Sequence, residues 1–317
     1  MRNLIKPLLF SGVVMMCMTS CDDNGTDNMM TDRTTYELVA SDSNLTSLKA
    51  AIDKAGLSTT LSQSGTFTLF APTNAAFSTF LQANGYASLN DVPAATLKTL
   101  LMNHVLGSEM KASAIATGYV STMAMGSAST TRNISMFINT SGGVKINGTA
   151  NVVQTDIDAN NGVIHKVDAV IALPTVTTHV MANPQFSTMV SALTRNDMPN
   201  FTAILSGSAN APFTVFAPTN NAFASLLTQL NLSALASIPQ ATLEGALKYH
   251  VVAGSNKAST DLTNNMTLTT LQGSTFTITT SGGVKITDKN NRVSNVILTD
   301  VQCSNGIIHG IDKVLLP

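Results

Sequence analysis

The feature that most constrains this chain is a stretch of seven residues that occurs twice. Residues 68–74 read Thr-Leu-Phe-Ala-Pro-Thr-Asn and residues 214–220 read Thr-Val-Phe-Ala-Pro-Thr-Asn, an offset of 216 − 70 = 146 residues. The apolar run predicts a buried strand, and the proline ends it because proline cannot donate a ladder hydrogen bond. The threonine or the asparagine that follows can cap a helix. The residues that carry this signal are Pro72, Thr73, Asn74, Pro218, Thr219 and Asn220.

Further segments recur in the same order. A helix begins near a proline and ends in a histidine, over residues 93–104 and 239–250. A hairpin with period-two alternation follows, and each copy closes on a strand that carries a second histidine, over residues 161–171 and 305–315. The recurring histidines are His104, His165, His250 and His309. Helices followed by strands favour the α+β class.

The first twenty residues have the features of an export signal. An apolar run over residues 8–18 is too short to span a bilayer comfortably, and basic residues precede it. The small residues before Cys21 resemble the lipobox of bacterial lipoproteins, in which the cysteine carries the acyl chains. Cys17 fits less well because two methionines precede it. We expect a signal peptide over residues 1–20 and a flexible tether over residues 21–34, and a simple membrane anchor or an uncleaved helix is the alternative.

The acidic pair Asp22 and Asp23, just after Cys21, indicates where in the cell the protein is located. It resembles the signal that sends lipoproteins of the Bacteroidetes to the cell surface. We therefore expect an outer-membrane protein that contacts the membrane through its lipid anchor only and is exposed at the cell surface.

Composition narrows the possible partners. The net charge is −1 and only 11% of the residues are charged, so we expect no nucleic-acid partner, which would call for a basic surface. After Cys21 only Cys303 remains, so neither half can contain an internal disulfide. We expect Cys303 to be a buried, unreactive thiol.

The ordered set of motifs resembles that of the fasciclin (FAS1) domain family. Besides the helix that ends in histidine, the resemblance rests on Phe-Ala-Pro-Thr-Asn-x-Ala-Phe and Asn-Gly-x-Ile-His-x-x-Asp. The first motif occupies residues 70–77 and 216–223, and the second occupies residues 161–168 and 305–312. The resemblance implies two FAS1 domains, over residues 35–174 and 175–317. Each would be a wedge-like β-sandwich with several packed helices.

The same resemblance implies a function in adhesion. FAS1 domains are associated with adhesion to matrix, to other cells or to carbohydrate, and in animal members a Tyr-His pair is linked with integrin binding. Tyr249 and His250 keep that pair, whereas the first copy has Asn103 and His104. A bacterium has no integrin of its own, so only a candidate binding role is inferred for Tyr249 and His250.

Two functions remain open at this point. The first is a lipid-anchored adhesion protein that presents both FAS1 domains to extracellular matrix, glycan or surface-protein ligands. The alternative is an accessory structural component of an outer-membrane assembly that handles polysaccharide and binds a protein partner.

The recurring histidines also raise the question of a metal site or an enzyme. Zinc needs three or four ligands, and the nearest recurring carboxylates, Asp168 and Asp312, would point to the opposite strand face from the histidine three residues earlier. We expect the histidines to hydrogen-bond the backbone in the core, with no metal and no cofactor. The sequence has no Gly-x-Ser-x-Gly elbow and no recurring pair of carboxylates, so an enzyme is not expected.

Overall fold

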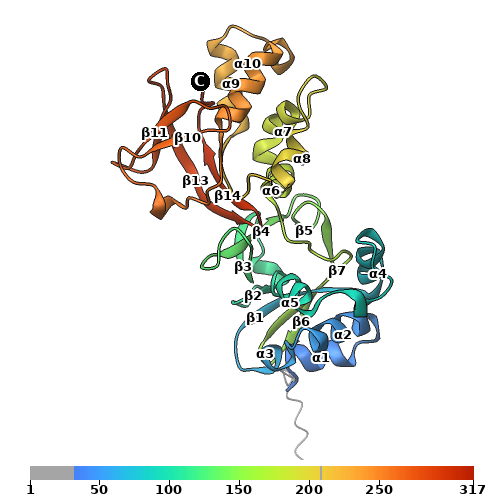
Figure 1. Cartoon of the computed structure of the whole chain (residues 1–317). Helices are drawn as coiled ribbons and strands as arrows, with labels where there is room; N and C mark the ends of the chain where they lie inside the picture. Colours follow the sequence, from blue (N-terminus) through green and yellow to red (C-terminus); the bar gives the residue numbers. More distant parts are fainter. Residues whose placement is uncertain (1–31, 208) are drawn as a thin grey trace, which may run out of the picture. The chain divides into compact units, whose positions relative to one another are not determined.

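The computed structural model describes residues 32–207 and 209–317. The predicted signal peptide, Cys21 and nearly all of the tether lie outside these residues. The described residues belong to one compact unit, in which two copies of one fold follow each other along the chain (Figure 1). Among the described residues, none of the helices combines the length and the hydrophobicity that crossing a membrane requires.

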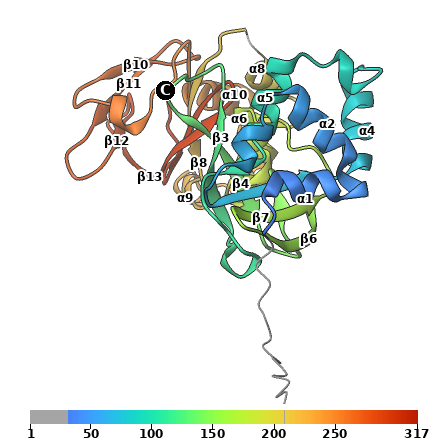
Figure 2. The same cartoon turned by 90° about the horizontal axis from the view of Figure 1, so that it is seen from below.

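The first copy is built from short helices around a sheet. Its helices are α1 (Thr35–Ser41), α2 (Thr46–Lys54), α3 (Ser58–Ser62), α4 (Asn74–Ala83) and α5 (Ala94–Met102). Its strands are β1 (Phe67–Pro72), β2 (Val105–Leu106), β3 (Gly118–Met125), β4 (Asn133–Asn139), β5 (Lys145–Ile146), β6 (Ala150–Ala159) and β7 (Gly162–Val167). Figure 2 shows α1, α2 and α4 grouped together, and all three supply side chains to one apolar cluster.

The second copy repeats this plan. Its helices are α6 (Val176–Ala182), α7 (Ser187–Leu193), α8 (Phe201–Ser206), α9 (Asn220–Gln229) and α10 (Gln240–Tyr249). Its strands are β8 (Phe213–Pro218), β9 (Val251–Ala253), β10 (Thr267–Thr269), β11 (Thr275–Thr279), β12 (Lys285–Thr287), β13 (Val293–Cys303) and β14 (Gly306–Ile311).

Each copy contains a seven-stranded mixed sheet with the same strand order. The order is β2-β1-β7-β6-β5-β4-β3 in the first copy and, read from the matching edge, β9-β8-β14-β13-β12-β11-β10 in the second. In each sheet one pair is parallel, with Phe70 opposite His165 and Phe216 opposite His309. The shared order and register confirm the predicted α+β class and the duplication of one folding unit.

Layers form on both faces of the central strands. Leu69 and Ala71 of β1 belong to the cluster that contains Leu48 of α2, whereas Phe70 belongs to a second cluster with Ile138 of β4. Because successive side chains of a strand point to opposite faces, helices cover one face of β1 and the hairpin strands pack against the other. This arrangement places helices along one side of each sheet.

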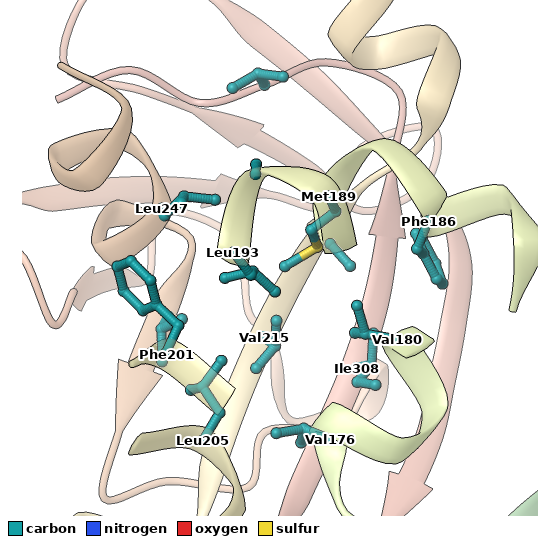
Figure 3. Close-up of a cluster of buried hydrophobic side chains, with 14 of the residues drawn as sticks. Val176, Val180, Phe186, Met189, Leu193, Phe201, Leu205, Val215, Leu247 and Ile308 are labelled. Atoms are coloured by element: carbon teal, nitrogen blue, oxygen red, sulfur yellow. The ribbon is translucent and has the colours of Figure 1, made fainter. Parts of the chain in front are cut away.

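Figure 3 shows the larger core of the second copy. Val180 of α6, Met189 of α7 and Leu205 of α8 face Val215 of β8 and Ile308 of β14. Each of these side chains is at most 3% exposed. Burial of such a side chain contributes about 1.5–3 kcal/mol, so packing on the sheet, more than intrinsic propensity, holds these short helices in place.

The helices that were expected to end in histidine stop earlier. The helix predicted over residues 93–104 is α5, which ends at Met102, so His104 lies in the turn after it. The chain leaves the helix there because Val105 pairs with Leu69 of the sheet. In the second copy α10 ends at Tyr249, and the chain enters β9 at residue 251 in the same way.

The closing strands are also shorter than predicted. The strand expected over residues 161–171 is β7, which ends at Val167. Asp168 ends it because its carboxylate accepts hydrogen bonds from the backbone N–H and the side-chain amide of Asn151, both at 2.7 Å. The strand expected over residues 305–315 likewise ends at Ile311.

Direct contacts join the two copies. The N–H of Ala128 donates to the Ser304 carbonyl at 3.1 Å. Tyr119 of β3 meets His179 of α6 edge-on, with ring centroids 5.4 Å apart, and the Asn183 amide donates to the Tyr119 hydroxyl at 3.3 Å. His179 is fully buried, and neither of its ring nitrogens has a hydrogen-bond partner within the described residues.

Candidate functional site

The recurring threonine and asparagine organise a joint between two helices. Thr73 caps α4 by accepting from the N–H three residues later, and Thr219 does the same for α9. The Asn74 side chain accepts from the N–H of Ser47 at 2.9 Å and donates to a carbonyl of the 3₁₀ turn before α2. Asn220 makes the matching pair of bonds in the second copy. These residues hold neighbouring helices together.

His104 and His250 tie the end of a helix to the last segment of each copy. Nδ1 of His104 donates to the Leu100 carbonyl and Nε2 accepts from the N–H of Ile171, both at 2.8 Å. His250 bonds the carbonyl four residues earlier at 2.6 Å and the N–H of Leu315 at 2.9 Å. Burial lowers the pKa of each imidazole to about 4, although the carbonyl bond favours the charged form. Both rings are therefore neutral at pH 7.

His165 and His309 hold a loop against the closing strand. Nε2 of His165 donates to the Met110 carbonyl at 2.8 Å, and Nδ1 accepts from the N–H of Asp156 at 3.2 Å. His309 makes the same 2.8 Å bond to the Lys257 carbonyl. All four recurring rings thus hydrogen-bond the backbone. Among the described residues, no group of three or more His, Cys, Asp or Glu side chains could hold a metal ion.

The structure places the Tyr-His pair in the core of the second copy. Tyr249 is 0% exposed and His250 is 1% exposed. The Tyr249 hydroxyl donates to the Thr275 carbonyl at 2.7 Å and accepts from the N–H of Lys289 at 3.2 Å. Neither side chain is open to a ligand here, because α10 directs both into the core. Their candidate binding role remains a prediction, whereas the geometry shows that Tyr249 fixes the turn after β12.

The single thiol of the described chain lies in the core. Cys303 is 0% exposed, and burial raises its pKa well above the usual value. The thiol donates weakly to the Val301 carbonyl at 3.5 Å. Since the thiolate is the reactive form, Cys303 is a packing residue.

The second copy contains a groove of about 350 Å³ beside α9. One wall is α9, the second is the turn over residues 288–292 with the start of β13, and the third is the segment over residues 312–315 that follows β14. Ala222, Leu226, Val314 and Leu315 supply its apolar lining, and Ser225, Gln229, Asp288, Arg292, Asp312 and Lys313 supply most of its polar atoms. Its volume lies within the range of about 300–1,000 Å³ that is typical of small-molecule sites.

An ion pair forms the rigid part of the groove. Arg292 donates to Asp288 from Nε at 2.9 Å and from Nη2 at 2.6 Å, and Nη2 also reaches the Val314 carbonyl at 3.2 Å. Burial alone would raise the pKa of Asp288, but Arg292 and the N–H of Leu316 hold that pKa below its usual value. The carboxylate is therefore charged, and it fixes the guanidinium in one orientation.

The remaining hydrogen-bonding capacity of the groove lies mainly on donors. Both oxygens of Asp288 and both oxygens of Asp312 already accept bonds from the protein. In contrast, Nη1 of Arg292 and Nζ of Lys313 have no hydrogen-bond or ion-pair partner within the part of the chain that the structure describes. The same holds for the Ser225 hydroxyl and the Gln229 amide, which are both exposed. The groove therefore presents one unpaired ammonium, one free nitrogen of an ion-paired guanidinium, and two neutral polar groups.

Comparison with known protein families matches the fasciclin domain twice, over residues 43–174 and 184–317. The chain belongs to the fasciclin domain family. Uncharacterized protein sll1735 of Synechocystis is 37% identical over 144 residues, which are 45% of this chain and 98% of that protein. Protein sll1483 of the same organism is 38% identical over 135 residues, which are 43% of this chain and 69% of that protein.

Two further comparisons cover more of the chain at lower identity. Human periostin is 27% identical over 267 residues, which are 80% of this chain but 28% of periostin. A solved FAS1 domain pair from the insect cell adhesion molecule Fasciclin I covers 84% of this chain and 92% of its own, with 21% identity and a TM-score of 0.48.

The two fasciclin domains differ at the groove. Where the second domain has Gln229, Ser294 and Lys313, the repeat places Ala83, Ala150 and Ala169 in the first. The turn that carries Asp288 and Arg292 lies where the second domain has gained residues, since the offset between the copies rises from 283 − 143 = 140 at the hairpin to 309 − 165 = 144 at the histidine. Gln229, Lys313 and the turn with Asp288 and Arg292 therefore belong to the second fasciclin domain alone, whereas Ser225 and Asp312 match Thr79 and Asp168 of the first.

Sequence reasoning did not predict the groove. Its walls come from residues 222–229, 288–294 and 312–315, and only the fold brings these three segments together. Two signals were present in the sequence: the residues gained around the turn, and polar residues that stand opposite alanines of the first copy. Both are differences between the copies, and the similarity of the copies does not reveal them.

Proposed function

We propose that the chain is an adhesion or ligand-binding protein of the cell surface, held to the outer membrane by lipid on Cys21. It presents two fasciclin domains to extracellular matrix, glycan or surface-protein ligands. Proteins of the fasciclin family are generally binding proteins without enzymatic activity, and some are adhesion or matrix proteins. The lipobox-like sequence supports the anchor.

The observation that carries this proposal is the groove of the second domain. It offers polar donors that the fold itself leaves unused, whereas the recurring histidines and asparagines are occupied by backbone bonds. Exposed, unpaired donors beside an apolar lining are what a binding site supplies to a polar ligand. In chain order the first fasciclin domain separates Cys21 from the second, so it serves as a spacer that carries the groove away from the membrane.

Attachment of coated particles tests this function. Beads that carry the purified chain should bind a subset of surfaces on an array of glycans and matrix proteins, and soluble chain added as a competitor should release them. Cells that lack the gene should lose attachment to the same surfaces. Equal attachment to every surface with and without competitor, and in the deletion strain, would refute an adhesion function. Protease added to intact cells should cut the protein; an uncut chain would contradict surface exposure.

A second function, docking to a protein partner within an outer-membrane assembly, is favoured by a different observation. Val153 of β6 and Ile297 of β13 occupy matching positions, since 297 − 153 = 144, and both are 58% exposed. Each lies where a bulge interrupts the pairing with the next strand. Purification in mild detergent distinguishes the two functions, because a stoichiometric protein partner supports docking and a lone chain supports adhesion.

A further inference from the structure

We propose that the groove beside α9 binds a carboxylate-bearing sugar unit, and that the second fasciclin domain alone has this site. The inference rests on the proposed binding function and names the ligand class for its groove. It follows from three observations: the donors of Arg292 and Lys313 that have no protein partner, the apolar lining, and the alanines that stand opposite Gln229 and Lys313 in the first domain.

The charge of the ligand follows from the donors. Every carboxylate oxygen of Asp288 and Asp312 already accepts at least one bond from the protein, and Asp288 is the more fully occupied of the two. Nη1 of Arg292 and Nζ of Lys313 remain available, and the guanidinium is held in place by its bonds to Asp288 and Val314. The free Nη1 of the ion-paired guanidinium and the unpaired ammonium favour a carboxylate ligand, which can accept from both.

The neutral part of the groove selects a sugar over a bare anion. Ser225 and Gln229 lie one helical turn apart on the exposed side of α9, so a hydroxyl and an amide face the ligand from the same wall. Leu226 of the same wall and Val314 of the segment after β14 supply apolar lining. A uronic acid combines these features, because it carries a carboxylate, several ring hydroxyls and an aliphatic ring face. A bare anion would use only the cationic donors and leave the hydroxyl and the amide to water, so it would gain nothing from them.

The first domain shows which substitutions the fold accepts. It has Ala83 where the second domain has Gln229, and Ala169 where the second domain has Lys313. Both residues of the second domain are exposed and make no side-chain hydrogen bond within the described structure. Lys313→Ala and Gln229→Ala therefore give the second domain the alanines that the first domain has at the matching positions. Both variants should fold normally.

Calorimetric titration of the full chain in detergent tests the site. The probes are tetragalacturonate, the same oligosaccharide with methyl-esterified carboxylates, inorganic sulfate and tetraglutamate. The unmodified chain should bind tetragalacturonate with one site per molecule and should bind the methyl ester at least tenfold more weakly. Lys313→Ala should weaken binding of tetragalacturonate about tenfold to a hundredfold, as expected for loss of a charge-assisted hydrogen bond. Gln229→Ala should weaken it by less, because it removes a neutral partner.

Lys98→Ala is the matched control, since it removes an exposed lysine from α5 of the first domain. It should bind as the unmodified chain does. The inference is overturned if the methyl ester binds equally, if sulfate or tetraglutamate binds as well as the sugar, or if Lys313→Ala binds like Lys98→Ala. It is also overturned if two sites are found per chain, or if tetragalacturonate does not bind at all. In each of those cases, continued attachment of coated beads would show that the proposed adhesion function survives without this ligand.

Discussion

Mild acid should destabilise both fasciclin domains, because their cores contain neutral imidazoles that are hard to protonate while the domain is folded. Burial lowers the pKa of His104 in the first domain, and of His179 and His250 in the second, to about 4. An unfolded histidine titrates near 6.5. Between these values the unfolded chain binds protons that the folded chain does not. The stability that these groups contribute is complete above pH 6.5 and is lost progressively as the pH falls toward 4.

The size of the effect follows from the two pKa values. At pH 5 an unfolded imidazole is almost fully protonated, whereas one with a folded pKa of about 4 is mostly neutral. The linkage relation then gives a loss of about 2 kcal/mol for each buried histidine between pH 7 and pH 5. Carboxylates contribute little in this window, because they stay largely ionised in both states. The second domain has two such histidines and should lose more stability than the first.

Urea unfolding at pH 7, 6 and 5 measures this loss, and His104→Gln isolates one histidine. The amide can donate to the Leu100 carbonyl or accept from the Ile171 N–H, but it does not titrate. The variant should be less stable than the unmodified chain at pH 7. Between pH 6 and pH 5 its free energy of unfolding should decrease less than that of the unmodified chain. The difference between the two slopes should be up to about 1.4 kcal/mol per pH unit.

Lys98→Gln, which alters an exposed side chain of α5, should keep the original slope. Two results would refute the reasoning: a free energy of unfolding that is the same at pH 5 and pH 7, or an unchanged slope in His104→Gln. Either result would mean that the imidazoles accept protons without unfolding the domain.

Three further predictions concern single positions in the second domain. Gly306→Ala should destabilise it by several kcal/mol in urea unfolding, since a Cβ there would lie 2.3 Å from the Phe213 carbonyl oxygen. Gly245→Ala in α10 is the matched control, because a Cβ there meets nothing within 4 Å; it should stabilise the domain by about 0.5–1 kcal/mol. Cys303 should react with a thiol reagent only after urea unfolds the domain, because burial raises its pKa; labelling of native chain at the rate of free cysteine would contradict this. Tyr249→Phe should lower stability by about 1–2 kcal/mol and leave attachment of coated beads unchanged; lost attachment at full stability would restore a direct binding role.

The sequence was sufficient to predict the fold because the repeat gave two independent readings of each element. A proline after an apolar run ended the strand in both copies, and the matching histidines indicated one shared role. Burial of Tyr249 was harder to predict, because a tyrosine near the end of an amphipathic helix can face either the core or solvent. Element ends were missed for a related reason: α5 stops at Met102 because the next residues pair with β1, and that partner is distant in sequence.

A duplicated fold allows scaffold and ligand site to be separated by comparing the copies. A residue that the shared fold requires is expected to recur in both copies, and the histidines and asparagines that recur here hold backbone segments together. A residue that serves a ligand recurs only if both copies bind that ligand. Gln229 and Lys313 stand opposite alanines, and their side chains make no hydrogen bond that the fold needs within the described residues. The guanidinium of Arg292 has a structural role through Asp288 and Val314, and only its Nη1 is left for a ligand. Function in this chain should therefore be sought where the two domains differ, and the groove beside α9 combines such differences with hydrogen-bond donors that the fold leaves unused.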